Sequence, residues 1–158
     1  MKSIRSRRVA AAILLAAAVA SGCSTTGASV TYAFDPQFSF TEAKTYEWAK
    51  SKPLYASNAL VEANVRFLTD RHLQAKGLNQ AATNPALHAW IGYEPDYYPT
   101  YYTTTSGYQL RTLTINIARA GDGVVVWQGR AVGSIRTDAA SGDLKSAVEG
   151  MLAHFPPK

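Results

Sequence analysis

Residues 108–133 decide the fold, and they read YQLRTLTINIARAGDGVVVWQGRAVG. Residues 108–118 alternate, with Leu113, Ile115 and Ile117 on one side and polar residues on the other, as in a strand with one buried face. Ala120-Gly121-Asp122-Gly123 is typical of a hairpin turn, and residues 124–133 form the return strand. The segment therefore predicts a long antiparallel hairpin.

Two helices are predicted on either side of this hairpin in the sequence. Residues 59–76 carry an apolar stripe and stop at Gly77. Residues 143–154 carry a second one and stop at Pro156-Pro157. We expect these faces to be buried: Val61, Val65, Leu68, His72 and Ala75, with Leu60 and Leu73 at the edges, in the first helix; Leu144, Ala147, Val148, Met151, Leu152 and Phe155 in the second.

Three further segments, 30–34, 45–49 and 87–93, have the composition or alternation of strands. The predicted order is β-β-α-β-β-β-α. Because a helix with one apolar stripe needs a sheet to cover, the sequence predicts an α+β fold. We expect an antiparallel sheet of about five strands, covered on one face by the two helices.

The N-terminus has the layout of a bacterial lipoprotein export signal. Four basic residues precede an apolar stretch over 9–20, and Ala20-Ser21-Gly22 then leads to Cys23, the single cysteine. About twenty apolar residues are needed to span a bilayer, so this stretch is too short. We predict a signal peptide over 1–22, a lipidated tether over 23–29 and one domain over 30–158, with Cys23 as the acylated residue. A cleaved signal without lipid is the alternative.

The anchor restricts the remaining chemistry. Three acyl chains on Cys23 would hold the protein on the membrane permanently. The resemblance to Gram-negative lipoproteins implies that Ser24 directs the protein to the outer membrane, where the domain would lie in the periplasm. No thiol is then left for a disulfide, for catalysis or for a metal. Four of the sixteen Lys and Arg residues lie in the signal, which leaves twelve basic against eleven acidic residues. This balance argues against nucleic acid as a partner.

Tyrosines concentrate in residues 93–108, which hold six of the nine in the chain. Tyrosine combines a rigid apolar ring with a hydroxyl, which suits recognition surfaces and stacking on sugar rings. The alternative is a long connection whose tyrosines pack back on the sheet. We name as the candidate binding surface five of these residues: Tyr93, Tyr97, Tyr98, Tyr101 and Tyr102.

Catalytic and metal-binding patterns are missing from the sequence. His72, His88 and His154 have no metal-ligand spacing, and there is neither a nucleophile elbow nor a phosphate loop. Glu94 and Asp96 fit a solvated loop better than an acid/base pair. We expect no enzyme activity, no catalytic residue, no metal and no cofactor, with a hydrolase of unrecognised site as the alternative.

Three sequence blocks resemble the DUF4136 family of bacterial lipoproteins, and their order covers nearly the whole mature chain. They are Phe34-Asp35-Pro36 with Phe38-Ser39-Phe40 and Lys44–Trp48, Val126–Ala131, and Ala147-Val148 through Phe155-Pro156-Pro157. The resemblance implies an envelope lipoprotein and supplies no mechanism. Our leading expectation is an envelope interaction or structural module that is held on the membrane by its lipid anchor and has an envelope protein or a glycan as its partner, with the oligomeric state left open. The alternative is a small-molecule or glycan-binding module that uses the tyrosine-rich segment.

Overall fold

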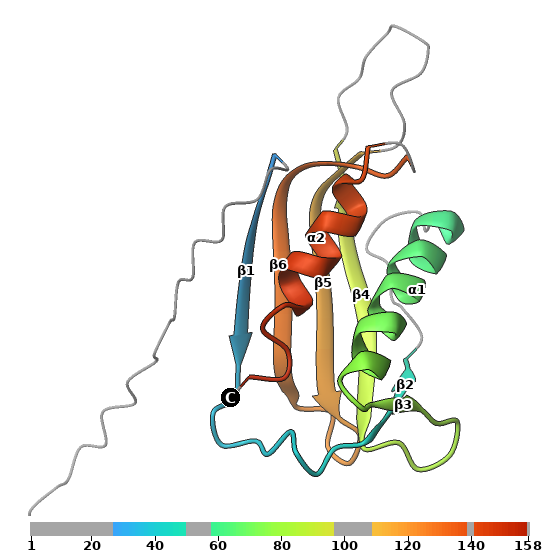
Figure 1. The fold of residues 1–158 in the computed structure, drawn as a ribbon, viewed down its shortest axis with the longest axis vertical. Helices are drawn as coiled ribbons and strands as arrows, with labels where there is room; N and C mark the ends of the chain where they lie inside the picture. Colours follow the sequence, from blue (N-terminus) through green and yellow to red (C-terminus); the bar gives the residue numbers. More distant parts are fainter. Residues whose placement is uncertain (1–26, 50–57, 97–108, 139–140, 158) are drawn as a thin grey trace, which may run out of the picture.

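The computed structural model of the chain describes residues 27–49, 58–96, 109–138 and 141–157. They form a sheet of order β1-β6-β5-β4-β2-β3 with two helices against it (Figure 1). The elements, in chain order, are β1 Ala28–Phe34, β2 Thr45–Trp48, α1 Ala59–Ala75, β3 Asn79–Gln80, β4 Leu87–Pro95, β5 Gln109–Arg119, β6 Val125–Arg136 and α2 Asp143–Leu152.

The predicted α+β class is confirmed, with two differences in the sheet. It has six strands rather than about five, because the two-residue strand β3 joins its edge. It is also mixed: β1, β6, β5 and β4 pair antiparallel, whereas β2 pairs parallel with both β4 and β3. The reason is that α1 lies between β2 and β4 in the chain, and a helical crossover returns the next strand in the same direction.

The predicted hairpin is β5–β6. Gly123, at φ 72°, closes the turn by donating its N–H to the Arg119 carbonyl at 2.8 Å. The register pairs Ile115 with Gly129 and Ile117 with Trp127, and shifts at two places along the ladder. The long strands continue this antiparallel pairing to β1 on one side and to β4 on the other.

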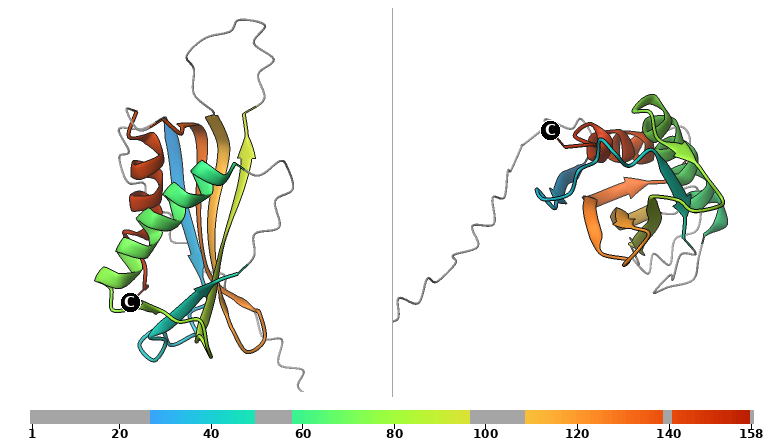
Figure 2. Two further views of the ribbon diagram at one scale, coloured as in Figure 1. Left: turned by 90° about the vertical axis from the view of Figure 1, so that its right-hand side faces the viewer. Right: turned by 90° about the horizontal axis from the view of Figure 1, so that it is seen from below.

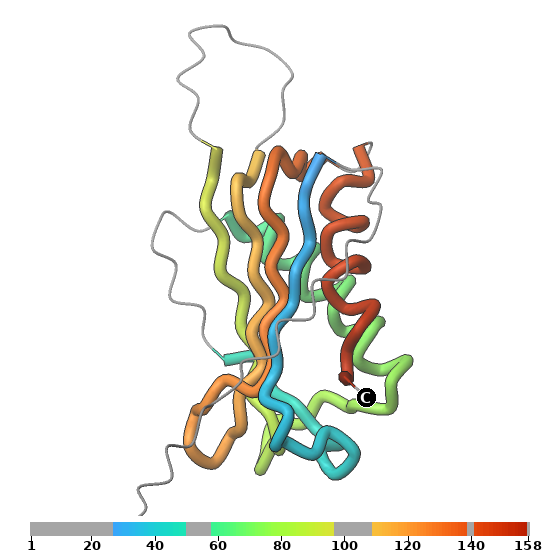
Figure 3. Tube along the Cα trace, turned by 90° about the vertical axis from the view of Figure 1, so that its left-hand side faces the viewer, coloured from blue at the N-terminus to red at the C-terminus, as the bar shows by residue number. Residues whose placement is uncertain are grey.

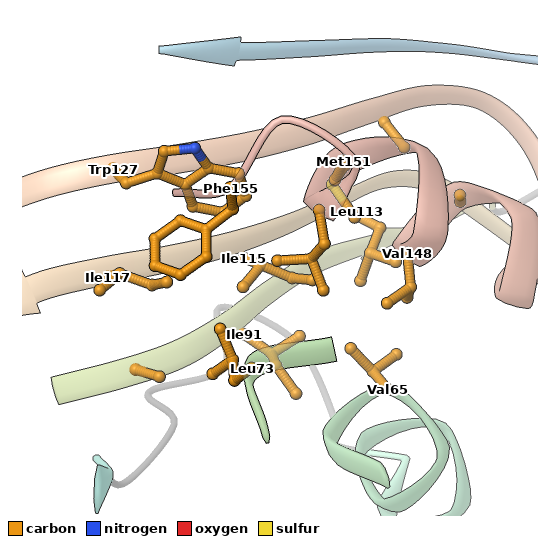
Figure 4. Packing of buried hydrophobic residues seen from close by; sticks show 14 of the residues in the cluster. Val65, Leu73, Ile91, Leu113, Ile115, Ile117, Trp127, Val148, Met151 and Phe155 are labelled. Carbon is orange, nitrogen blue, oxygen red and sulfur yellow. The ribbon is translucent and has the colours of Figure 1, made fainter. Parts of the chain in front are cut away.

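Both helices lie on the same face of the sheet, and the opposite face carries none in the described residues (Figures 2 and 3). The core fills the space between helices and sheet (Figure 4). The prediction for α2 is confirmed, because all six residues of its expected face are buried.

The predicted stripe of α1 was wrong in part. Its buried residues are Val61, Val65, Thr69 and Leu73, an i, i+4 row, with Leu68 partly buried beside them. His72 is half-buried in the last turn, as expected of a histidine beside the core, while Ala75 is exposed and Leu60 is 78% exposed. The expected face was predicted from hydrophobic residues alone. It therefore left out Thr69, whose methyl-bearing side chain is fully buried.

Gly129 explains the closest approach between α2 and the sheet. A Cβ atom there would lie 2.5 Å from Cη2 of Trp127 and 2.8 Å from Cβ of Met151. The Trp127 ring, fully buried, meets the Phe155 ring edge-on at 5.2 Å between centroids. The absence of a side chain at position 129 therefore makes room for both the indole and the helix, as expected for a glycine inside a strand.

Candidate functional site

Only one of the predicted site residues lies in the described part of the chain. Cys23, Tyr97, Tyr98, Tyr101 and Tyr102 fall outside the described residues, so lipidation and the binding role of the segment stay predictions. Tyr93 is described. It lies near the end of β4 on the same side of the sheet as Ile91 and Ala89, which are buried in the core.

The Tyr93 side chain has a structural role. Its hydroxyl accepts a 2.6 Å hydrogen bond from the Asn58 backbone N–H and donates to Oε1 of Glu62 at 3.4 Å. Asn58 is itself the N-cap of α1, since its side-chain oxygen accepts from Leu60 and Val61. Burial, and then the neighbouring Glu62 carboxylate, raise the pKa of Tyr93, against a lowering by the Asn58 N–H. Tyr93 thus fixes the start of α1 on β4.

The tightest polar cluster joins β2 to α1. Asp70 Oδ1 accepts from the Tyr46 hydroxyl at 2.6 Å and from Nε1 of Trp48 at 2.8 Å. The Arg66 guanidinium lies 5.1 Å from the centroid of a Trp48 ring. Burial, together with the hydrogen bond to Asp70, raises the pKa of Tyr46, so this hydroxyl stays protonated and keeps donating. The two hydrogen bonds to Asp70 hold strand β2 against helix α1, so this cluster has a structural role.

The helix-free side of the sheet presents a different kind of surface. Strand alternation and the pairing register place on it a set that we call the open face: Ser29, Thr31, Ala33, Glu47, His88, Trp90, Glu94, Thr112, Thr114, Asn116, Gln128, Arg130 and Val132. Its centre is uncharged. Trp90, Asn116 and Gln128 lie side by side on β4, β5 and β6, with the charged residues around them.

Hydrogen bonds order the centre of the open face across three strands. Gln128 Nε2 donates to Asn116 Oδ1 at 2.6 Å, Asn116 Nδ2 donates to Thr114 Oγ1 at 3.5 Å, and Thr114 Oγ1 donates to the Gly92 carbonyl at 3.1 Å. Asn116 is only 6% exposed although no described helix covers it. These side chains are therefore held in fixed orientations before any partner arrives.

Among the described residues, the titratable groups do not converge on a reactive centre. His88 lies 3.9 Å from Glu47, and the His154 ring stacks on Tyr32 with centroids 4.9 Å apart. Glu94 and Asp96 have separate partners and do not act as a pair: the Thr112 hydroxyl donates to Glu94 at 3.4 Å, and Arg111 forms an ion pair with Asp96 at 3.3 Å.

Metal-binding and membrane-spanning features are equally absent from the described ranges. They contain no group of three or more His, Cys, Asp or Glu side chains that could hold a metal ion. Nor does any helix among them have the length and apolar character needed to cross a bilayer.

A shallow depression lies at the hairpin end of the sheet. It has a volume of about 380 Å³ and is bordered by Phe38, Glu42, Arg119 and Asp122 among others. Arg119 and Asp122 form a 2.9 Å ion pair with each other. The charges of Arg119 and Asp122 are thus already paired with each other across the hairpin turn. The depression is therefore a weaker candidate binding site than the open face.

Comparison with known proteins settles the family. The sequence profile of DUF4136, a domain of unknown function, matches residues 30–157. The chain belongs to the DUF4136 family. A DUF4136 family protein from Bacteroides thetaiotaomicron has the same fold, with 18% sequence identity and a TM-score of 0.55 over 82% of this chain and 94% of that one.

Two other solved structures share the fold of this DUF4136 domain. PelC from Paraburkholderia phytofirmans, described as a dodecamer, is 14% identical with a TM-score of 0.56 over 80% of this chain and 96% of that one. A PDZ domain protein from Parabacteroides distasonis is 16% identical with a TM-score of 0.61 over 82% of this chain, which spans only 35% of that protein. A search of curated proteins finds no match.

The structure gives the sequence blocks of this DUF4136 chain physical roles. Tyr46 and Trp48 of the first block both donate to Asp70, and Gly129 of the second admits Trp127 and Met151. Phe155 of the third packs on Trp127 and Phe40. Sequence reasoning missed Asp70, which has no motif, and it did not use Trp90 and Asn116, although their place in the alternation was visible.

Proposed function

We propose that this DUF4136 protein is a lipid-anchored lipoprotein of the cell envelope whose domain acts as an interaction module without catalysis. The N-terminal pattern that ends at Cys23 supports the anchor, with Ser24 favouring the outer membrane and a periplasmic domain. Binding is proposed rather than catalysis because the strongest polar clusters, around Asp70 and Tyr93, are used to hold α1 in place.

The open face carries this proposal. Protein interfaces favour Trp and Arg and disfavour Lys, Glu and Asp at their centres. The centre of the open face follows that composition, with Trp90 beside hydrogen-bonded amides and Arg130 nearby, while its acidic residues lie away from the centre, Glu47 on β2 and Glu94 near the end of β4. Since Gln128, Asn116 and Thr114 already have fixed orientations, a partner would dock without a large cost for ordering them.

Assembly is a part of the proposal. PelC, which shares the fold, is described as a dodecamer, and this supports using such a domain in a larger envelope structure. The second candidate, a small-molecule or glycan-binding module at residues 93–108, has less support, since the hydroxyl of Tyr93 is engaged by Asn58 and Glu62. For the other four tyrosines it stays a prediction.

Photocrosslinking in intact envelopes tests the surface. A benzophenone amino acid replaces Trp90 on β4 in one variant and Phe67 on α1 in the control, so that an aromatic residue replaces an aromatic one in both. Phe67 is 61% exposed on the helical side. We expect discrete protein adducts from position 90 and not from position 67. Equal labelling at both positions, or none at position 90, would contradict the proposal.

The anchor is tested separately by mass. Intact protein extracted from membranes should begin at Cys23 and carry three acyl chains, and Cys23→Ser should abolish that modification while the domain still folds. A mature chain that begins elsewhere without lipid would refute the anchor and leave the open face untouched.

A further inference from the structure

Three side chains of the open face have polar groups without a partner in the described part of the chain. The exposed Arg130 guanidinium forms no ion pair there, and the Trp90 Nε1–H has no acceptor. Gln128 uses only its Nε2, which donates to Asn116 at 2.6 Å and leaves the Oε1 free. The open face therefore offers a cation, a hydrogen-bond donor and a hydrogen-bond acceptor that no described residue engages.

The strand register arranges these groups in a pattern that is complementary to itself. Two neighbouring rows cross β4, β5 and β6 in that order: Trp90, Asn116 and Gln128 in one, and Gly92, Thr114 and Arg130 in the other. A rotation of 180° about an axis along β5, midway between two facing sheets, exchanges β4 with β6 and keeps each row opposite itself. Trp90 of one copy then faces Gln128 of the second, and Gly92 faces Arg130.

We propose that the open face binds the open face of a second copy of this chain about this two-fold axis, with Asn116 at the centre of the contact. The inference rests on the proposed function, because it names the partner of the same surface. The interface is isologous, so each contact occurs twice. Facing sheets lie about 10 Å apart with strand directions within about 30° of each other, which keeps the central rows opposite one another.

Charge complementarity selects this axis. Gly92 has no side chain, so the Arg130 stem of the second copy fits against β4 at that position. The guanidinium then lies between the Trp90 ring and the Glu94 carboxylate, both of which attract it. Glu94 is exposed, and within its own chain it accepts only a 3.4 Å hydrogen bond from Thr112. An axis across the strands would instead place Arg130 over β6 of the second copy, a strand without an acidic residue.

The uncharged groups match under the same rotation. The Trp90 Nε1–H of one copy faces the Gln128 Oε1 of the other, which pairs a donor with an acceptor. Like charges stay apart, because Arg130 on β6 and Glu94 on β4 lie on opposite sides of the axis. Because the bond between Gln128 and Asn116 already orients both amides, little ordering is needed on docking.

The proposed anchor suits this arrangement. An axis along the strands brings the start of β1 to the same end of both copies, so two chains held at Cys23 reach one membrane. Confinement to a membrane raises the effective concentration of the copies. We therefore expect them to pair on the membrane and to separate in dilute detergent solution.

Charge reversal in the native envelope tests the pairing. The reporter is the benzophenone amino acid at position 90 of the full-length protein, and the measured quantity is the yield of covalent dimer linked to β6 of a second copy. Arg130→Glu or Glu94→Arg alone should lower this yield at least about tenfold, because each places like charges opposite each other. Arg71→Glu, at an exposed arginine of α1, is the matched control and should leave the yield unchanged.

Co-expression of the two reversed chains, each with its own epitope tag, gives the decisive reading. Neither Arg130→Glu nor Glu94→Arg should pair with itself, but opposite charges meet at both contacts when the two chains pair, so crosslinks between the tags should recover. Urea unfolding of each variant checks that these exposed substitutions leave the fold intact.

The remaining outcomes separate this inference from the proposed function. A dimer that is insensitive to charge reversal, or no recovery on co-expression, would overturn the pairing. Adducts from position 90 to another protein, with none to a second copy, would also overturn it and would leave the open face as an interaction surface. No adduct at all from position 90 would count against both.

Discussion

Replacing Gly129 with alanine tests the packing of α2 on the sheet more sharply than any truncation. The added Cβ atom would lie 2.5 Å from the Trp127 ring and 2.8 Å from Cβ of Met151. Neither neighbour can move easily, because Trp127 is fully buried against Phe155 and the Met151 Cβ is fixed to the helix backbone. The helix must therefore shift away from β6 or the indole must leave its rotamer.

The magnitude follows from two opposing effects. Overpacking a core by a methyl group costs about 1–3 kcal/mol. Removing glycine from a strand returns about 0.5–1 kcal/mol, because the unfolded chain loses conformational freedom. Because neither neighbour can give way, we take the upper part of the overpacking range, about 2–3 kcal/mol, and expect a net loss of about 1–2.5 kcal/mol. At a urea dependence of about 2 kcal/mol per molar, this loss lowers the unfolding midpoint by about 0.5–1.3 M.

Urea unfolding followed by tryptophan fluorescence is the assay, and Gly121→Ala is the control. Gly121 lies in the β5–β6 turn, where an added Cβ would meet nothing within 4 Å. The free energy of unfolding of Gly121→Ala should stay within about 0.5 kcal/mol of the wild-type value, as for a neutral surface change. If Gly129→Ala were as stable as Gly121→Ala, the close approach of Trp127 and α2 described above would be incorrect.

Three further predictions concern the polar contacts. Tyr93→Phe should lower the free energy of unfolding by about 0.5–1.5 kcal/mol, because the Asn58 N–H loses its acceptor; unchanged stability with loss of a ligand would restore Tyr93 to the binding surface. Asp70→Ala should cost at least about 1–3 kcal/mol, because it leaves the Tyr46 hydroxyl and the Trp48 N–H without their acceptor; urea unfolding measures this, with Glu42→Ala, which removes an exposed carboxylate, as the control. The hydrogen bond from Arg136 lowers the pKa of Asp143. The contribution of this pair to folding stability is therefore complete above the ordinary carboxyl pKa, and it is lost as the pH falls through the lowered pKa of Asp143. Asp143→Asn should consequently be less stable than wild type at pH 7, and that difference should shrink or vanish under acid; a difference independent of pH would mean that the ion pair has no part in it.

The sequence predicted those parts of the fold that local patterns encode. Alternation identified β4, β5 and β6, and the 3.6-residue period identified the buried face of α2 residue by residue. Pairing between distant segments has no such local signal. The parallel pairing of β2 with β4 depends on how α1 crosses the sheet, and β3 is too short to show a period.

The candidate site was harder to predict for a related reason. Aromatic density pointed to residues 93–108, yet Tyr93 binds the N-cap of α1, which lies 35 residues earlier in the chain. Asn116 and Gln128 are ordinary polar residues in sequence, and only the strand register places them in contact beside Trp90. Asp70 likewise acquires its role from two donors on β2, more than twenty residues away.

Oxidative footprinting of Trp90 in intact envelopes tests the interaction surface most directly. Hydroxyl radicals modify solvent-accessible aromatic side chains, and Trp90 is partly exposed. The ratio of oxidation at Trp90 to that at Phe67 can therefore be compared between purified protein and the native envelope. Phe67, on the opposite side of the molecule and 61% exposed, serves as the internal reference. If the open face docks on a partner, the ratio falls several-fold in the envelope. An unchanged ratio would contradict the proposal that this face is where the protein meets its partner.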